Sequence, residues 1–111
     1  MTGTDEARPW LTTWGEVLGA LPSLRRSDMV CFGNGPSAPE DGCLVADSAD
    51  LDEDEDVPPE AAERDWNTAL LKEEIEDILG NLRQQIGDPS MELMLRAIAY
   101  FVDHDAFLAV G

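Results

Sequence analysis

The sequence predicts an α+β domain: a small two- or three-stranded antiparallel sheet packed against about three helices, the last two forming a C-terminal helical pair. Three patterns predict this class: an early amphipathic helix, two short apolar runs around a Gly- and Pro-rich loop, and two amphipathic stretches at the end. The length of 111 residues allows one small hydrophobic core. We therefore expect a flexible polar lead over residues 1–8 and a single compact domain over residues 9–111.

The first helix is predicted shortly after the polar lead. Thr13 and Glu16 have the spacing of a capping box, in which a hydroxyl and a carboxylate accept hydrogen bonds from amides left free at a helix N-terminus. Pro22 marks the end, because the residue before a proline is biased away from the helical conformation. The apolar residues that share one face of this helix are Trp14, Val17, Leu18 and Leu21.

Two short strands are predicted next, at about 29–33 and 43–47. Residues 34–42, between them, are rich in Gly, Pro, Ser and acid, which is typical of a hairpin loop longer than the tight two-residue type. Gly33-Asn34-Gly35 is a turn signal, because no helix start follows it to make a phosphate-binding loop. Residues 65–71 either open the next helix or form a third strand, and we favour the strand.

The C-terminal third predicts two consecutive helices. The first begins at Lys72 and ends at Gly87. The second begins at Asp88-Pro89, since a proline at the first helical position loses no hydrogen bond. The tail Phe107-Leu108-Val110 is apolar enough to pack against the core. The first apolar stripe contains Leu71, Ile75, Ile78, Leu79, Leu82 and Ile86, and the second contains Met91, Met94, Leu95, Ile98, Phe101 and Val102.

The charge of the chain is strongly unbalanced. It has 24 acidic and 7 basic residues and a formal net charge of −17, which disfavours direct binding to nucleic acid or to an anionic membrane. Residues 47–60 form an acidic loop, and such a run repels itself, so we expect it to be solvated rather than packed. Six carboxylates fall in seven positions, interrupted only by Leu51: Asp50, Asp52, Glu53, Asp54, Glu55 and Asp56.

A calcium site is the first alternative for this loop. Five acidic residues occupy positions one, three, five, nine and twelve of an EF-hand loop, but position six, normally Gly, is Val57 followed by two prolines. We therefore expect no metal site and no cofactor. The five residues are Asp52, Asp54, Asp56, Glu60 and Glu63.

Nothing in the sequence indicates a catalytic site, and we expect a protein that is not an enzyme. Cys31 and Cys43 are too few for a disulfide scaffold and lack the spacing of a zinc site, so we expect two reduced, buried thiols. His104 stands between Asp103 and Asp105, where a His–Asp contact can build a general base, but no nucleophile lies near it in sequence. A charged helix terminus explains it as well.

The three tryptophans have two interpretations. Trp14 lies on the stripe of the first helix, so we expect it in the core. Trp10 and Trp66 flank less regular sequence and are either core residues or anchors in a protein interface, a role that tryptophan often fills.

The order of these features resembles a family of short, acidic, uncharacterised bacterial proteins that look like immunity proteins of polymorphic-toxin and contact-dependent systems. The resemblance covers most of residues 10–108, and no binding residue is carried over from it. The segments that carry it are Trp14-Gly15-Glu16-Val17-Leu18, Val30-Cys31-Phe32, Cys43-Leu44-Val45-Ala46-Asp47, Asp52-Glu53-Asp54-Glu55-Asp56-Val57-Pro58-Pro59 and Ala99-Tyr100-Phe101-Val102-Asp103-His104-Asp105-Ala106-Phe107.

The sequence thus predicts a protein that acts by binding a basic partner, because complementary charge speeds encounter and selects partners. The resemblance implies an immunity protein that occludes the basic cleft of a cognate toxin, such as a nuclease. The alternatives are an acidic adaptor or nucleic-acid mimic that binds a basic host protein, and a loop that only improves solubility. The polar start and the absence of an apolar run of about 20 residues lead us to expect a cytoplasmic protein, a monomer or weak homodimer. The expected partner-binding residues are the six carboxylates of 50–56 with Trp10 and Trp66.

Overall fold

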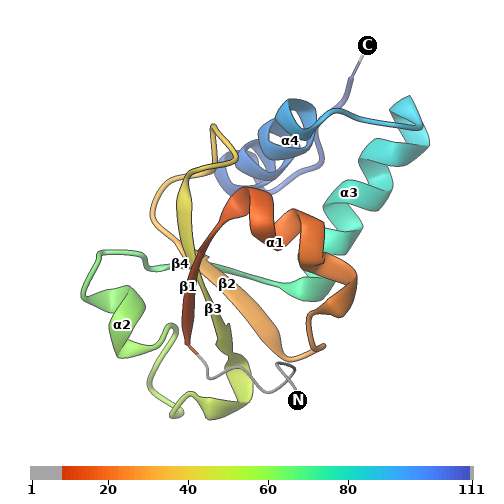
Figure 1. Cartoon of the computed structure of the whole chain (residues 1–111). Helices are drawn as coiled ribbons and strands as arrows, with labels where there is room; N and C mark the ends of the chain where they lie inside the picture. Colours follow the sequence, from red (N-terminus) through yellow and green to blue (C-terminus); the bar gives the residue numbers. More distant parts are fainter. Residues whose placement is uncertain (1–8, 111) are drawn as a thin grey trace.

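A four-stranded antiparallel sheet lies at the centre of the computed structural model of the chain, which describes residues 9–110 (Figure 1). The strands are β1 (Trp10–Thr13), β2 (Asp28–Phe32), β3 (Gly42–Asp47) and β4 (Thr68–Leu71), in the order β1-β3-β2-β4. The α+β class, the predicted strands at 29–33 and 43–47 and the strand favoured within 65–71 are confirmed. The flexible lead predicted for residues 1–8 lies outside the described residues.

The sheet has more strands than the two or three that we expected. The additional strand is β1, which is short and runs directly into a helix, so no sequence period distinguishes it. Its strand identity comes from pairing with β3, where Trp10 lies opposite Val45 and Thr13 opposite Gly42.

The hairpin that joins β2 and β3 confirms the predicted loop. Asp41 holds it together, because its carboxylate accepts hydrogen bonds from the amides of Ser37 (2.8 Å) and Ala38 (3.0 Å). These bonds hold the pKa of Asp41 below its ordinary value. Close packing explains why residue 35 is a glycine, since a Cβ there would lie 2.8 Å from the Cβ of Ala99 in the last helix.

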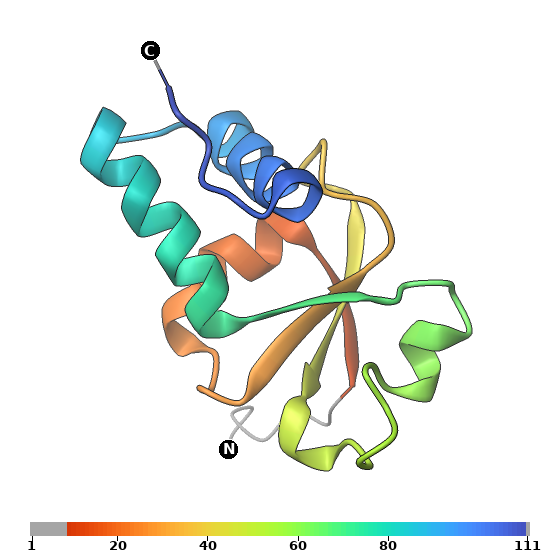
Figure 2. The ribbon, with the colours of Figure 1, turned by 180° about the vertical axis from the view of Figure 1, so that it is seen from behind.

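Three helices cover one face of the sheet: α1 (Trp14–Ala20), α3 (Lys72–Ile86) and α4 (Met91–His104) (Figures 1 and 2). Half of the predicted capping box is present, because the Thr13 hydroxyl accepts from the Glu16 amide at 3.3 Å. The Glu16 carboxylate accepts instead from the hydroxyl of Thr12, at 2.5 Å. A short 3-10 turn, η1 (Leu21–Ser23), contains Pro22 and ends the helical run.

The two C-terminal helices are confirmed, with one corrected boundary. α3 ends at Ile86, and Gly87 caps it with a φ of 93°, a conformation that glycine adopts readily. The predicted start of α4 at Asp88-Pro89 is wrong. Ser90 is the N-cap, with its hydroxyl accepting from the amide of Leu93 at 3.1 Å, and the helix begins at Met91.

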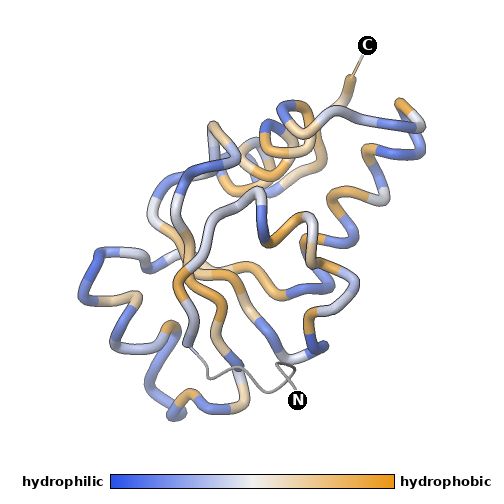
Figure 3. Tube along the Cα trace, in the orientation of Figure 1, coloured by the Kyte–Doolittle hydropathy of each residue, from blue (hydrophilic) through white to orange (hydrophobic). Residues whose placement is uncertain are grey.

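The main core lies between these helices and the sheet. Trp14 is fully buried there, as predicted, and meets Phe32 edge-to-face with ring centroids 5.1 Å apart. Figure 3 shows apolar stretches along the central strands and within the helices that cover them. The buried residues that α3 and α4 contribute are Ile75, Ile78, Leu79, Leu82, Leu95, Ala97 and Ile98.

The ends of the predicted stripe and the tail need one correction. Leu71 and Ile86, at the two ends of the first stripe, are exposed. Leu71 is the last residue of β4 and lies opposite Met29, so it is on the sheet face away from α3. Ile86 is the last residue of α3. In the tail, Leu108 and Val110 pack against the core, and Phe107, 44% exposed, stacks on Phe101 with ring centroids 5.8 Å apart. Gln85 holds this tail, donating to the Leu108 carbonyl at 2.9 Å and accepting from the Val110 amide at 2.8 Å.

Among the residues that the structure describes, no helix combines the length and the apolar character needed to cross a membrane.

We predict that truncating the centre of either C-terminal stripe is costly. Leu79→Ala or Ile98→Ala removes a buried side chain and leaves a cavity, so each lowers the free energy of unfolding by about 2–5 kcal/mol. Ile86→Ala, on an exposed side chain, is the matched control, with a change of about 0.5 kcal/mol. Urea unfolding measures all three, and equal midpoints for the three variants would contradict this core.

Candidate functional site

The acidic segment, residues 48–66, lies on the face of the sheet opposite α1, α3 and α4. It contains a 3-10 turn, η2 (Ser48–Asp50), and a short helix, α2 (Pro59–Ala62). The prediction that this run does not pack is wrong. Leu51, Val57 and Ala61 contact the second face of β2 and β3, where the sheet residues Met29, Cys31, Leu44 and Ala46 are buried beneath them.

Polar contacts fix the path of the acidic segment. Ser48 donates two hydrogen bonds to the carbonyl oxygen of Ser27, one from its amide at 2.8 Å and one from its hydroxyl at 2.7 Å. Further along, the Glu55 carboxylate accepts from the Asp52 amide at 3.1 Å. The segment ends in a bond from the Trp66 amide to the Ala61 carbonyl, at 2.9 Å. The Ser48 bonds therefore tie the start of the segment to the chain before β2, and the other two bonds hold turns within the segment.

The predicted binding carboxylates lie on the outside of this packed segment. Asp50, Asp52, Glu53, Asp54 and Asp56 are exposed, and Glu55 is half-buried. Because Leu51 and Val57 face the sheet on either side of the run, the charges between them are presented to solvent at fixed places. Of the six, the structure brings Asp50 and Glu55 together, because both line the same groove.

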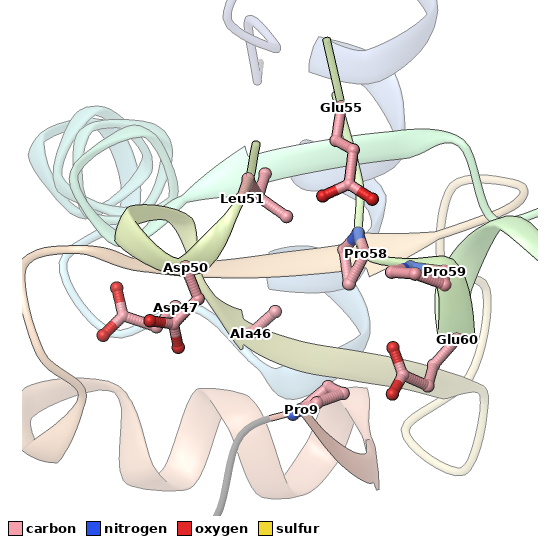
Figure 4. A pocket seen from close by; sticks show the side chains of 9 residues that line it. All are labelled: Pro9, Ala46, Asp47, Asp50, Leu51, Glu55, Pro58, Pro59 and Glu60. Atoms are coloured by element: carbon pink, nitrogen blue, oxygen red, sulfur yellow. The ribbon is translucent and has the colours of Figure 1, made fainter. Parts of the chain in front are cut away.

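A groove of about 160 Å³ opens between the acidic segment and the sheet (Figure 4). Its apolar lining comes from three parts of the chain: Pro9 before β1, Ala46 on β3, and Leu51, Pro58 and Pro59 of the acidic segment. The remaining lining residues are all acidic: Asp47, Asp50, Glu55 and Glu60. Such a site suits the apolar stem and charged head of a lysine or arginine side chain.

The charges around the groove are only partly compensated. The Arg25 guanidinium forms two ion pairs: its Nη2 lies 3.7 Å from Asp47 Oδ2, and its Nε lies 3.6 Å from Oδ1 of the buried Asp28. Within residues 9–110, the carboxylates of Asp50, Glu55 and Glu60 form no ion pair with a basic side chain. These three carboxylates leave the groove negative.

The two candidate anchor tryptophans lie on opposite faces of the sheet. Trp10 packs against the main core beneath the helices, whereas Trp66 packs against the second face. A Cβ on Gly33 would lie 3.2 Å from the Trp66 ring, so the indole lies close against this glycine, and Arg64 lies 5.8 Å from the ring centroid. Only Trp66 therefore shares a face with the acidic segment, and Trp10 is not part of that surface.

The two cysteines are free and buried, as predicted, on opposite faces of the sheet. Burial raises the pKa of Cys31 to about 11. Burial, then the nearby Cys31 and Glu16, raises the pKa of Cys43 to about 12. Neither thiol is an activated nucleophile at neutral pH. His104 lies in the last turn of α4, where its ring packs on Tyr100 with centroids 4.2 Å apart.

The geometry of the calcium alternative fails at the position that we identified. Val57, at position six, is 8% exposed and packs on the sheet, and Pro59 begins α2. Across residues 9–110, no group of three or more His, Cys, Asp or Glu side chains is arranged to hold a metal ion.

Sequence reasoning missed part of the groove. It gave Pro9 no role and considered Glu60 only as a calcium ligand. Their place in the groove depends on β1 and on the packing of α2, and neither was predicted. The unbroken apolar runs Met29–Phe32 and Cys43–Ala46 carry the missed signal, since strands that lack alternation are covered on both faces.

These features define a small, strongly acidic α+β domain with a packed acidic segment on one sheet face. The chain matches the family described as a domain of unknown function, DUF7716, over residues 11–110, and it belongs to that family. No curated protein and no solved structure matches the chain.

We predict that the folded protein does not respond selectively to calcium. Position six of an EF-hand loop turns sharply and is normally Gly, whereas here it is Val57, which is buried against the sheet and followed by two prolines. The thermal midpoint should be the same with millimolar calcium, with magnesium and with a chelator, apart from small shifts from screening common to both ions. A saturable rise of many degrees with calcium alone would contradict this geometry.

Proposed function

We propose that the protein is an immunity protein, which binds and neutralises a cognate bacterial toxin domain by covering a basic active cleft such as that of a nuclease. It acts by binding, without catalysis and without a cofactor. The observation that carries the proposal is the packed acidic segment, which leaves five of the six carboxylates of 50–56 exposed on a chain with a net charge of −17.

The packing of the segment supports a role in binding. A flexible acidic loop loses conformational freedom when it binds, whereas a segment anchored by Leu51, Val57 and Ala61 has already been ordered by folding. Its carboxylates can therefore occupy phosphate-binding positions of a nuclease cleft at a lower entropic cost.

The charge also fits a two-stage encounter. The field of the exposed carboxylates steers a basic partner toward this surface and raises the association rate. The negative groove beside the segment then provides a place for a cationic side chain of the partner. The first stage depends on ionic strength, since exposed charges are screened beyond the Debye length.

The alternative function, an acidic adaptor or nucleic-acid mimic for a basic host protein, uses the same surface. The two functions differ in the identity of the partner. Neutralisation of a toxin encoded by the adjacent gene supports the immunity function, and capture of a host DNA-binding protein supports the alternative.

We predict that neutralising the acidic segment slows association. The variant carries Asp52→Asn, Glu53→Gln, Asp54→Asn and Glu55→Gln, and the new side-chain amide at position 55 keeps an oxygen to accept from the backbone amide of residue 52. Binding to the product of the adjacent toxin gene is followed by surface plasmon resonance at about 0.1 M and about 1 M salt. At the lower salt the on-rate falls at least about tenfold, and its salt dependence flattens.

The matched control removes four exposed charges elsewhere, through Asp77→Asn, Asp88→Asn, Glu92→Gln and Asp103→Asn on and between α3 and α4. Both variants have the same net charge, so a difference between them reports the position of the charges. If the variant with the neutralised acidic segment associates at the parental rate, the segment only improves solubility. Equal slowing in both variants would show that total charge, rather than this surface, attracts the partner.

A further inference from the structure

Strand β1 is an edge of the sheet. In the order β1-β3-β2-β4 it pairs with β3 on one side, and no described strand pairs with it on the other. An unpaired edge exposes backbone amides and carbonyls that a further strand can bond.

The register identifies which backbone groups point outward. The Trp14 amide donates to the Asp41 carbonyl at 2.9 Å, at the end of the β1–β3 ladder. Because hydrogen-bonded and non-bonded pairs alternate in an antiparallel ladder, Trp10 and Thr12 are the residues of β1 that bond to β3. The amide and carbonyl of Leu11 therefore point away from the sheet.

The side chain of Leu11 is available on the same edge. It is 51% exposed and lies opposite Leu44, on the face of the sheet that carries the acidic segment. Pro9, two residues earlier and so on the same face, lines the negative groove. Pro9 thus places the start of β1 beside the groove (Figure 4).

We propose that β1 accepts an extended basic segment of a partner protein as an added strand. The backbone of the added strand hydrogen-bonds the amide and carbonyl of Leu11. Every second side chain of that strand lies over Leu11 and reaches into the groove between Asp50, Glu55 and Glu60. This inference rests on the proposed function in one respect, that the partner is basic. It adds the site and the mode of recognition.

Charge complementarity selects this occupant. A second copy of the chain would bring another net charge of −17 to the edge, whereas lysine or arginine side chains meet carboxylates that have no ion-pair partner within residues 9–110. The opposite edge is less open. On β4 the Leu71 amide already donates to the Glu74 carboxylate at 2.9 Å, and Ala69 packs within the second cluster.

The test uses the full chain and a blocked peptide of about six alternating lysine and valine residues. A second peptide has the same side chains but N-methylated amides, so it keeps the charge and loses the backbone donors. Amide hydrogen exchange, followed by NMR, reports the Leu11 amide directly. We expect the first peptide, at saturation, to slow exchange at Leu11 about tenfold and to bind at least tenfold more tightly than the N-methylated peptide.

Two protein variants test the edge itself. Leu11→Pro removes the outward amide without removing a bond of the β1–β3 ladder, and Ala69→Pro makes the corresponding change on β4. We expect Leu11→Pro to lose at least tenfold in peptide affinity and Ala69→Pro to keep the parental value. Thermal unfolding of both variants establishes that they are folded, and the N-methylated peptide tests the proposal on the unaltered chain.

Three results would overturn the proposal. Equal binding of the two peptides would show attraction by charge alone, which removes strand addition but leaves the proposed basic-partner function intact. Protection at Ala69 instead of Leu11 would place the added strand on β4. A dimer of the free chain that Leu11→Pro dissociates would make a second copy the occupant. The proposed function fails separately, if the parental chain does not bind the product of the adjacent toxin gene.

Discussion

The structure depends on the burial of both faces of two strands. Every residue of β2 is buried, and four consecutive residues of β3, Cys43 to Ala46, are buried with it. Three helices can cover only one face, and an uncovered apolar face costs about 25 cal/mol for each Å² left in water. The only described chain that covers the central strands on the other face is the acidic segment with Trp66. A repulsive run of carboxylates is thereby held against the sheet by the few apolar residues within it.

That constraint links the fold to the proposed function. Leu51, Val57 and Ala61 serve the core, and the acidic residues between and around them are turned to solvent. The same packing forms one wall of the groove beside β1. Stability and binding therefore use different side chains of one segment, so the carboxylates can be changed without emptying the second cluster.

Local patterns were sufficient for most of the fold and for only part of the site. The stripes of α3 and α4 and the hairpin loop follow from periodicity and turn chemistry, because neighbours in sequence determine them. Strand β1 and the position of the acidic segment arise from pairing and packing between distant residues, which a four-residue run or a charge pattern does not encode. Charge density indicated the carboxylates of 50–56, whereas Glu60 and the edge at Leu11 become part of the surface only when the sheet is assembled.

The order of the acidic segment is the most direct measure of the central claim, that burial of the second sheet face holds the carboxylates in place. Backbone ¹⁵N relaxation gives an order parameter for each amide on the picosecond-to-nanosecond timescale. The amides of Asp52 to Asp56 are expected to have order parameters close to those of β2 and β3, about 0.85. Values below about 0.6 across this run, with rigid strands beneath it, would show a solvated loop and contradict the claim.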